Sequence, residues 1–445
     1  MEIPVLDPGA LILLAGSERH AVIKRLIGSG GQGSVYEIDD SHGPLALKVY
    51  FSQTVDADPR LAQRLDRGIA LGPPDNAFLW PLDRARILGR PDLVAYVMPM
   101  RESRFVGMKR LISAPPDRVS PKLVDRAIAC LLTAECFHKL HARGQCYQDI
   151  SFGNLFLDPL NGEIAICDND NVDVNGAPAA VYGTRKFMAP EIVRREALPS
   201  TITDLYSMAV MFFYILMAWH PLDGRREHET LLLDGDAEVS LYGTDPLFMF
   251  DETDESNGPV AGVHDPIVRR WYSLPRTVRT LLTRAFTTGL KAGIGSRVLE
   301  TEWIEAFATM RDTIIACPNC TYEQVCETAS GGQFTCVACQ TPIAPPAAML
   351  LGRGRLLLSH GAKLRADRIG RESGRRRNTV VATVEPHPRD PSISGLRNLG
   401  TTTWTAVYVD GRSTAVAPGQ AARLAPGCRI DFGTVHGLCL NEDHA

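Results

Sequence analysis

The chain has 445 residues, of which 45% are hydrophobic and 22% are charged, and its formal net charge is −4. This composition is typical of a soluble globular protein with material for roughly three domains, and the weak charge gives no reason to expect a nucleic-acid partner. The longest apolar run, residues 205–219, is shorter than the roughly 18 residues that a membrane span needs. The apolar stretch 11–14 is too short for a secretory signal. We therefore expect a cytoplasmic protein with no membrane partner.

The first sixty residues predict strands that flank a glycine-rich turn. Residues 28–35 (GSGGQGSV) form a complete G-x-G-x-x-G-x-V pattern, in which Gly28, Gly30 and Gly33 let the backbone pass close to phosphate groups. Such glycines can also begin a dinucleotide-binding helix, but here the next residues continue as a strand. Lys48 follows on a further strand, where its amine can reach the same phosphates.

Residues 59–71 predict the next helix. It contains no glutamate, and its nearest polar candidates to face Lys48 are Gln63 and Asp66. Residues 93–100 (LVAYVMPM) then predict an apolar strand that runs into a proline.

A helix is expected over residues 123–142, and it leads into residues 145–154 (QCYQDISFGN). Asp149 can accept the proton of an attacking hydroxyl, and Asn154 can offer an oxygen to a metal that neutralises phosphates. Alone, this D-x-x-x-x-N pattern is weak, because Asp and Asn are common turn residues. Its weight comes from the ordered motifs on both sides.

A predicted hairpin follows, and its second strand, residues 163–168, ends in Asp168. Residues 183–191 (GTRKFMAPE) come next, before an apolar helix that begins near Asp204.

In this order the motifs resemble a Hanks-type (eukaryotic-like) serine/threonine protein kinase over residues from about 20 to 312. The resemblance implies a two-lobed fold that transfers phosphate from ATP, with Mg²⁺ or Mn²⁺, to a protein substrate. It makes Asp149 the catalytic base and Lys48 the phosphate-binding lysine, with Asn154 and Asp168 as the Mg²⁺ ligands. The residues that it implies around the nucleotide are Gly28, Gly30, Gly33, Val35, Ala46, Lys48, Met98 and Met100.

The chain departs from the family pattern at three places. Tyr147 and Gln148 replace the His-Arg pair, Asn169 and Asp170 replace the Phe-Gly of D-F-G, and the helix glutamate that pairs with the lysine is absent.

The missing arginine normally receives an activation-loop phosphate. Between Asp168 and Glu191 the only hydroxyl residues are Tyr182 and Thr184, and Thr184 belongs to the substrate-binding motif. We therefore expect a non-RD kinase that loop phosphorylation does not switch. Arg297 is expected to be the ion-pair partner of Glu191.

Four of the eleven cysteines form two C-x-x-C pairs, and the others are scattered singly, which fits a reducing cytosol better than a disulfide framework. The spacing of the pairs predicts a zinc ribbon over residues 313–345, with one Zn²⁺ held by Cys317, Cys320, Cys336 and Cys339. A redox pair or unpaired core cysteines are the alternatives, and neither explains the duplication. Cys326, between the pairs, is a possible substitute ligand.

Residues 342–348 are interpreted as a linker. Beyond it, short strands separated by turns predict a β-sandwich over residues 350–445 that resembles a forkhead-associated domain. Arg371 and Ser394 are its candidate phosphate contacts, but the histidine of the usual S-x-x-H is absent after Ser394. A protein-interaction role is favoured over phosphothreonine binding.

The predicted architecture is a multidomain α+β chain: a kinase domain over residues 1–312, the zinc ribbon and the forkhead-associated-like sandwich. This combination resembles the bacterial kinase of tellurite-resistance-associated triads, which implies a metal-dependent protein phosphatase and a von Willebrand A-type protein as partners in stress signalling. An active serine/threonine kinase is favoured, because Lys48, Asp149, Asn154 and Asp168 are all present. A nucleotide-binding pseudokinase scaffold and a chain dominated by its C-terminal interaction module are the alternatives.

Overall fold

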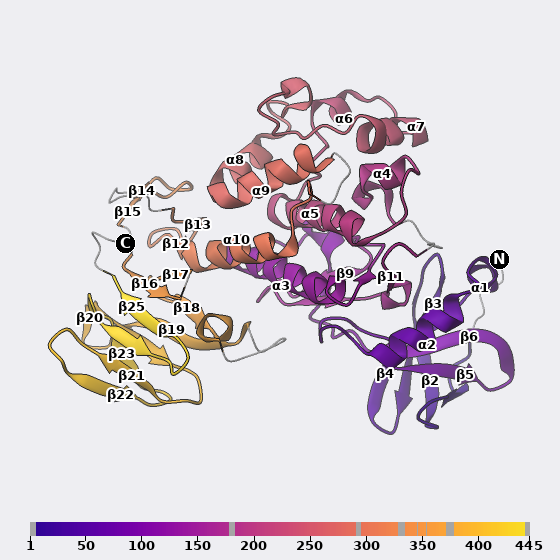
Figure 1. Cartoon of the computed structure of the whole chain (residues 1–445), viewed down its shortest axis with the longest axis horizontal. Helices are drawn as coiled ribbons and strands as arrows, with labels where there is room; N and C mark the ends of the chain where they lie inside the picture. Colours follow the sequence, from indigo (N-terminus) through magenta and orange to yellow (C-terminus); the bar gives the residue numbers. More distant parts are fainter. Residues whose placement is uncertain are drawn as a thin grey trace. The chain divides into compact units, whose positions relative to one another are not determined.

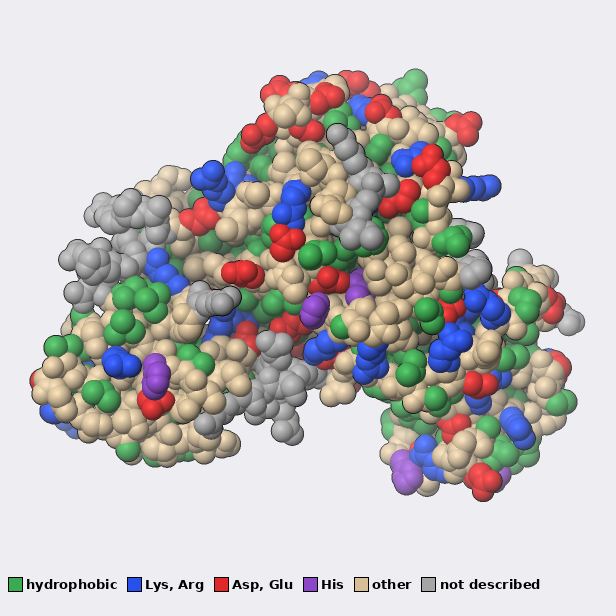
Figure 2. Space-filling model, viewed as in Figure 1, with side chains coloured by type: hydrophobic (Ala, Val, Ile, Leu, Met, Phe, Trp, Pro, Cys, Tyr) green, Lys and Arg blue, Asp and Glu red, His purple; other side chains and the backbone are tan. Residues whose placement is uncertain are grey.

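The computed structural model describes residues 6–177, 183–290, 295–327, 334–344, 346–352, 354–370 and 378–440. The chain forms two compact units, one of residues 1–121, 132–267 and 281–302 and the other of residues 122–131, 268–280 and 303–445. Figure 1 shows a strand-rich N-terminal part, a mainly helical middle and a strand-rich C-terminal part. Acidic and basic side chains are interspersed over the face visible in Figure 2, in keeping with the small net charge of −4.

Six antiparallel strands at the N-terminus close into a barrel in the order β1-β2-β3-β4-β6-β5. They are β1 (Leu11–Leu14), β2 (His20–Ser29), β3 (Gly33–Asp40), β4 (Gly43–Tyr50), β5 (Asp83–Ile87) and β6 (Arg90–Pro99). Alternate residues are apolar and point inward, so that side chains such as Ile12, Ile38 and Leu47 are fully buried. The predicted strands are confirmed, and the predicted helix is α2 (Leu61–Leu71), preceded by the short α1 (Ser52–Ala57).

The middle of the chain is mainly helical, with short strands around the predicted catalytic loop. The helices are α3 (Leu123–His141), α4 (Pro190–Val193), α5 (Thr201–Met217), α6 (Arg225–Glu229), α7 (Gly235–Val239), α8 (Asp265–Ser273), α9 (Arg276–Phe286) and α10 (Glu300–Thr313). The strands are β7 (Val106–Gly107), β8 (Gln145–Cys146), β9 (Leu155–Leu157), β10 (Ile164–Ile166) and β11 (Asp173–Val174). The predicted hairpin is confirmed, because β9 and β10 pair antiparallel.

The long apolar run forms α5, which a capping box between Ser200 and Thr203 begins. All of its residues from Thr203 to Met217 are buried, so the hydrophobic length serves a protein core. Among the described residues, no helix combines the length and the apolar character needed to cross a bilayer.

Two small antiparallel ribbons follow α10. The first pairs β12 (Ile314–Ala316) with β13 (Glu323–Val325), and the second pairs β14 (Phe334–Thr335) with β15 (Pro342–Ile343). The interpretation of residues 342–348 as a linker is therefore wrong at both ends, since β15 opens the segment and β16 (Ala348–Leu351) closes it. Both strands are too short to leave a period-two pattern in the sequence.

The last hundred residues form two antiparallel sheets. The first has the order β17-β16-β25-β24-β21-β22 and the second has the order β18-β19-β20-β23. The remaining bounds are β17 (Gly354–Leu357), β18 (Lys363–Arg365), β19 (Val380–His387), β20 (Asp390–Asn398), β21 (Trp404–Val407), β22 (Ser413–Val416), β23 (Ala421–Arg423), β24 (Arg429–Asp431) and β25 (His436–Cys439). Residues of both sheets share one hydrophobic cluster, in which the ring of Trp404 lies edge-on to Phe432.

Candidate active site

The predicted catalytic loop places Asp149 and Asn154 together. The side-chain amide of Asn154 donates to the Asp149 carboxylate at 3.0 Å and to the Asp149 backbone carbonyl at 2.8 Å. The other carboxylate oxygen of Asp149 accepts from the backbone N–H and the hydroxyl of Thr184, at 3.0 and 3.2 Å. Asp149 therefore already accepts a hydroxyl donor. Asn154 uses its amide nitrogen for these two bonds, which leaves its carboxamide oxygen as a candidate cation ligand.

A carboxylate of α5 fixes the backbone of the predicted catalytic loop. The carboxylate of Asp204 accepts the backbone N–H groups of Tyr147 and Gln148, at 2.6 and 3.1 Å. Gly183 approaches the same turn so closely that a Cβ there would lie 2.9 Å from the Gln148 carbonyl oxygen, and its φ of +95° also requires glycine. These contacts explain why an Asp on a buried helix and a distant glycine belong to the site.

Lys48 is a buried cation on β4 with three partners. Its ammonium lies 2.9 Å from Asp170, 3.3 Å from Asp168 and 3.2 Å from the side-chain carbonyl of Gln32. Burial lowers the pKa of Lys48, but the two carboxylates raise it by more, so the lysine stays charged. The sequence predicted the partnership with neither Asp170 nor Gln32. The helix candidates Gln63 and Asp66 both lie on the exposed face of α2.

Asp168 follows β10 in the left-handed conformation, with φ 51° and ψ 41°. A non-glycine residue in that region is uncommon and is typical of constrained functional turns. Burial, with Asp170 and Asp149 nearby, raises the pKa of Asp168, although Lys48 opposes the shift. An oxygen of Asp168 and the carboxamide oxygen of Asn154 have the chemistry that Mg²⁺ prefers, so the residues present fit that ion.

Four of the eight predicted nucleotide-lining residues share one apolar cluster. Ala46 and Met98, which pair directly between β4 and β6, are buried there, and Val35 and Met100 pack against them. Gly28 and Gly30 are exposed at the loop, and no atom lies within 4 Å of a Cβ built at either. At Gly33, in contrast, a Cβ would lie 2.2 Å from the Val49 carbonyl oxygen, so close packing against β4 requires that glycine.

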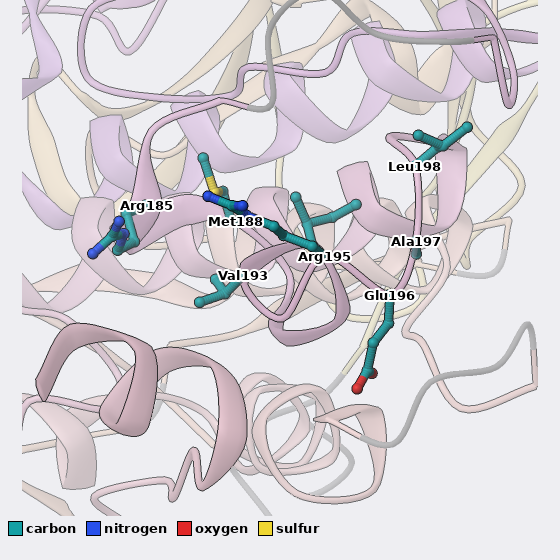
Figure 3. A pocket seen from close by; sticks show the side chains of 8 residues that line it. Arg185, Met188, Val193, Arg195, Glu196, Ala197 and Leu198 are labelled. Atoms are coloured by element: carbon teal, nitrogen blue, oxygen red, sulfur yellow. The ribbon is translucent and has the colours of Figure 1, made fainter. Parts of the chain in front are cut away.

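A pocket of about 540 Å³ is lined by the segment that follows Thr184 in the sequence. It is lined by Arg185, Met188, Ile192, Val193, Arg195, Glu196, Ala197 and Leu198. Figure 3 shows Arg195 extending toward Met188, while Glu196 points away from them. Arg297 donates to both carboxylate oxygens of Glu191 at 2.7 and 2.8 Å, so the ion pair expected from the sequence is confirmed.

The two C-x-x-C pairs come together in the second unit. The four sulfur atoms of Cys317, Cys320, Cys336 and Cys339 lie within 4.8 Å of one another, and two cross-pairs are 3.6 Å apart. A disulfide would bring two sulfurs to about 2.05 Å, whereas four thiolates around Zn²⁺ at about 2.3 Å are separated by about 3.8 Å. The donor set therefore fits a tetrahedral metal.

The candidate phosphate contacts of the C-terminal sheets are only partly described. The hydroxyl oxygen of Ser394, on β20, lies 3.4 Å from Nε2 of His360. Arg371 lies outside the described residues, as does Tyr182 of the activation segment.

Comparisons with known proteins bear on the class of protein to which this part of the chain is similar. Residues 99–284 match the family model described as protein kinase domain, so this stretch of the chain is similar to a protein kinase. That match holds the catalytic loop and the 183–191 segment, and the glycine loop and Lys48 precede it.

Two curated relatives are kinases by name, and one of them is named a serine/threonine-protein kinase. The chain is 25% identical over 207 residues to serine/threonine-protein kinase sck2 of Schizosaccharomyces pombe, covering 44% of this chain and 31% of the relative. It is 25% identical over 252 residues to human ribosomal protein S6 kinase alpha-1, covering 54% of this chain and 32% of the relative. The chain thus spans about a third of the length of these relatives. A solved structure titled ROP18 kinase domain in complex with AMP-PNP and sucrose aligns with a TM-score of 0.46 and 19% identity, covering 69% of this chain and 84% of that one.

Proposed function

We propose that the chain is a protein kinase that transfers the γ-phosphate of ATP to serine or threonine of a protein substrate. The observation that carries the proposal is the Asp149 carboxylate, which accepts a hydroxyl donor on one oxygen and is fixed by Asn154 on the other. A general base must have this access to a hydroxyl proton.

Each retained residue then has one task. The substrate hydroxyl oxygen attacks the γ-phosphorus, its proton passes to Asp149, and ADP leaves as the bond to the β-phosphate oxygen breaks. Lys48 holds phosphate oxygens of the bound nucleotide, and Asn154 and Asp168 would hold Mg²⁺. That ion neutralises charge on the phosphates. The pocket lined by residues 185–198 is the proposed seat of the substrate segment next to the phosphorylated hydroxyl.

The finer assignments belong to the same proposal. We infer a cytoplasmic signalling kinase of the tellurite-resistance type, with a metal-dependent phosphatase and a von Willebrand A-type protein as partners. The four-cysteine cluster supports a structural Zn²⁺ ribbon over residues 313–345. The two C-terminal sheets with one shared core support a sandwich that binds proteins, joined to the kinase domain of residues 1–312.

The test is transfer of radiolabelled phosphate from ATP to a generic protein substrate by the full chain. Asp149→Asn should lower turnover by roughly 10²–10⁴-fold and leave ATP binding nearly unchanged, because the base acts in the transition state. Asp158→Asn, a buried carboxylate paired with Arg104 at 3.1 Å, is the matched control. Equal turnover in the wild type and Asp149→Asn would reject catalysis here and favour the nucleotide-binding scaffold.

A further inference from the structure

Lys48 needs a fixed counter-charge that α2 does not provide. The buried polar side chain of α2 is Arg64, a cation, and Asp66 on its exposed face pairs with Arg84 at 3.3 Å. A lysine that is only 3% exposed loses most of its hydration and is costly unless a carboxylate is close and well oriented.

Asp170 supplies that carboxylate from the turn after β10. Its side chain is 0% exposed and lies 2.9 Å from the Lys48 ammonium. The hydroxyl of Tyr50 donates to the same carboxylate oxygen, and the hydroxyl of Tyr96 donates to the other at 3.0 Å. Both oxygens of Asp170 are thus held, and the carboxylate has one orientation.

The two tyrosines are placed by the sheet itself. Tyr50 lies two residues after Lys48 on β4 and therefore points to the same face, and Tyr96 on β6 is the register partner of Lys48. From α2, Arg64 donates to the backbone carbonyl of Asp170 at 2.7 Å and is itself neutralised by Asp58 at 2.7 Å. The helix supports the position of Asp170 without facing Lys48.

The neighbouring carboxylate has a different environment. The side chain of Asp168 is 38% exposed and lies 3.3 Å from Lys48, so it is accessible to a cation bound beside the lysine. Asp170 is enclosed by hydroxyl donors and the ammonium and cannot do so. Of the two acids in the Asp-Asn-Asp turn, Asp168 is therefore the one available to a metal ion and Asp170 is the one that pairs with Lys48.

We infer that Asp170 is the positioning residue for Lys48, in place of a carboxylate from α2, with Tyr50 and Tyr96 fixing its orientation. The inference rests on the proposed function and deepens it. Asp170 is on the same segment as Asp168, so one turn positions both the phosphate-binding lysine and the metal ligand. A movement of α2 is then not needed to bring a carboxylate to Lys48.

The experiment compares binding of ATP and of adenosine to the full chain, with and without Mg²⁺. Lys48 acts on phosphates, so Asp170→Asn should weaken ATP binding by about 100-fold and change adenosine binding less than about threefold, a split that a merely structural defect would not produce. Tyr96→Phe should weaken ATP binding by about 3- to 10-fold. Asp158→Asn should change neither.

A double-mutant cycle with Lys48→Ala tests whether the effect acts through the lysine. The losses from Asp170→Asn and Lys48→Ala should not add, because one residue positions the other. Additive losses, or an unchanged preference for ATP over adenosine in both Asp170→Asn and Tyr96→Phe, would overturn the inference. A loss seen only with Mg²⁺ would also overturn it and make Asp170 a metal ligand. Since these are binding measurements, they stand whether or not phosphate transfer is found. Should Asp170→Asn not fold, Tyr96→Phe and its cycle with Lys48→Ala decide the question.

Discussion

At the scale of single residues, Gln32 connects the glycine loop to Lys48 and to Asn171 in the turn after β10. Its side-chain carbonyl accepts from Lys48 at 3.2 Å, and its amide donates to Asn171 at 3.3 Å. The hydroxyl of Thr54 holds the Gln32 backbone carbonyl at 3.0 Å. In this arrangement Gln32 accepts a hydrogen bond from the ammonium of Lys48, the group that is proposed to bind the phosphates of the nucleotide.

Replacing Gln32 should therefore favour the nucleotide. Gln32→Ala removes the competing acceptor, and we expect ATP to bind at least about tenfold more tightly, since a hydrogen bond to a charged group contributes a net free energy of about 1.5–3 kcal/mol. Fluorescence titration with ATP checks this, with Thr54→Ala as the control that leaves the Gln32 side chain in place. Weaker binding by Gln32→Ala would mean that Gln32 contacts the nucleotide instead.

At the scale of elements, three helices meet at one histidine. His141, at the end of α3, contacts Asp204 of α5 at 3.2 Å and also Glu300 of α10. Burial lowers the pKa of His141, but the two carboxylates raise it by more, to about 9. The charged imidazole thus links α3 and α10 to Asp204, whose carboxylate accepts the backbone N–H groups of the predicted catalytic loop.

This link predicts an unusual pH dependence of stability. The folded-state pKa of about 9 lies above the ordinary value of 6.5, so the contribution of His141 is complete below about pH 6.5 and is lost as the pH rises through 9. The free energy of unfolding should fall on the order of 3 kcal/mol across that range. Urea unfolding at a series of pH values measures it. His141→Gln should be less stable at pH 6.5 and should lack this slope, and a parallel slope in both proteins would contradict the assignment.

At the scale of the whole molecule, the cysteine cluster joins the two small ribbons of the second unit. Cys317 and Cys320 follow β12, and Cys336 and Cys339 lie between β14 and β15. Ribbons of two or three residues cannot be stable alone. A metal ion bound by cysteines of both ribbons would stabilise them, because its binding free energy adds to the free energy of folding.

Metal analysis should therefore find about one zinc per chain, as four-thiolate stoichiometry requires. A strong chelator should lower the melting temperature by several degrees. Cys320→Ser should lose the zinc, whereas Cys326→Ser should keep it, because the sulfur of Cys326 is not among the four clustered sulfurs. Identical melting with and without chelator would reject the site.

The sequence by itself determined the parts of this protein that depend on local spacing. The glycine loop, the lysine on the next strand, the Asp149–Asn154 pair and the twin C-x-x-C pairs are short patterns whose chemistry requires those residue types at those distances. Helix and strand periodicity likewise predicted α2, α3, α5 and the β9–β10 hairpin, because each buries one regular apolar face or a continuous apolar run.

Only the tertiary structure decided which charge faces Lys48. Asp170 and Asp168 are both acids of one turn, and the sequence gives no sign that Asp170 is enclosed by Tyr50 and Tyr96 while the side chain of Asp168 stays partly exposed. Gln63 and Asp66 were predicted to face Lys48 because the position of a helix can be predicted from local sequence. Which side chains of that helix are buried depends on segments that are distant in sequence. Short strands such as β15 and β16 were missed for the same reason, since pairing across the sheet, and not their own pattern, makes them strands.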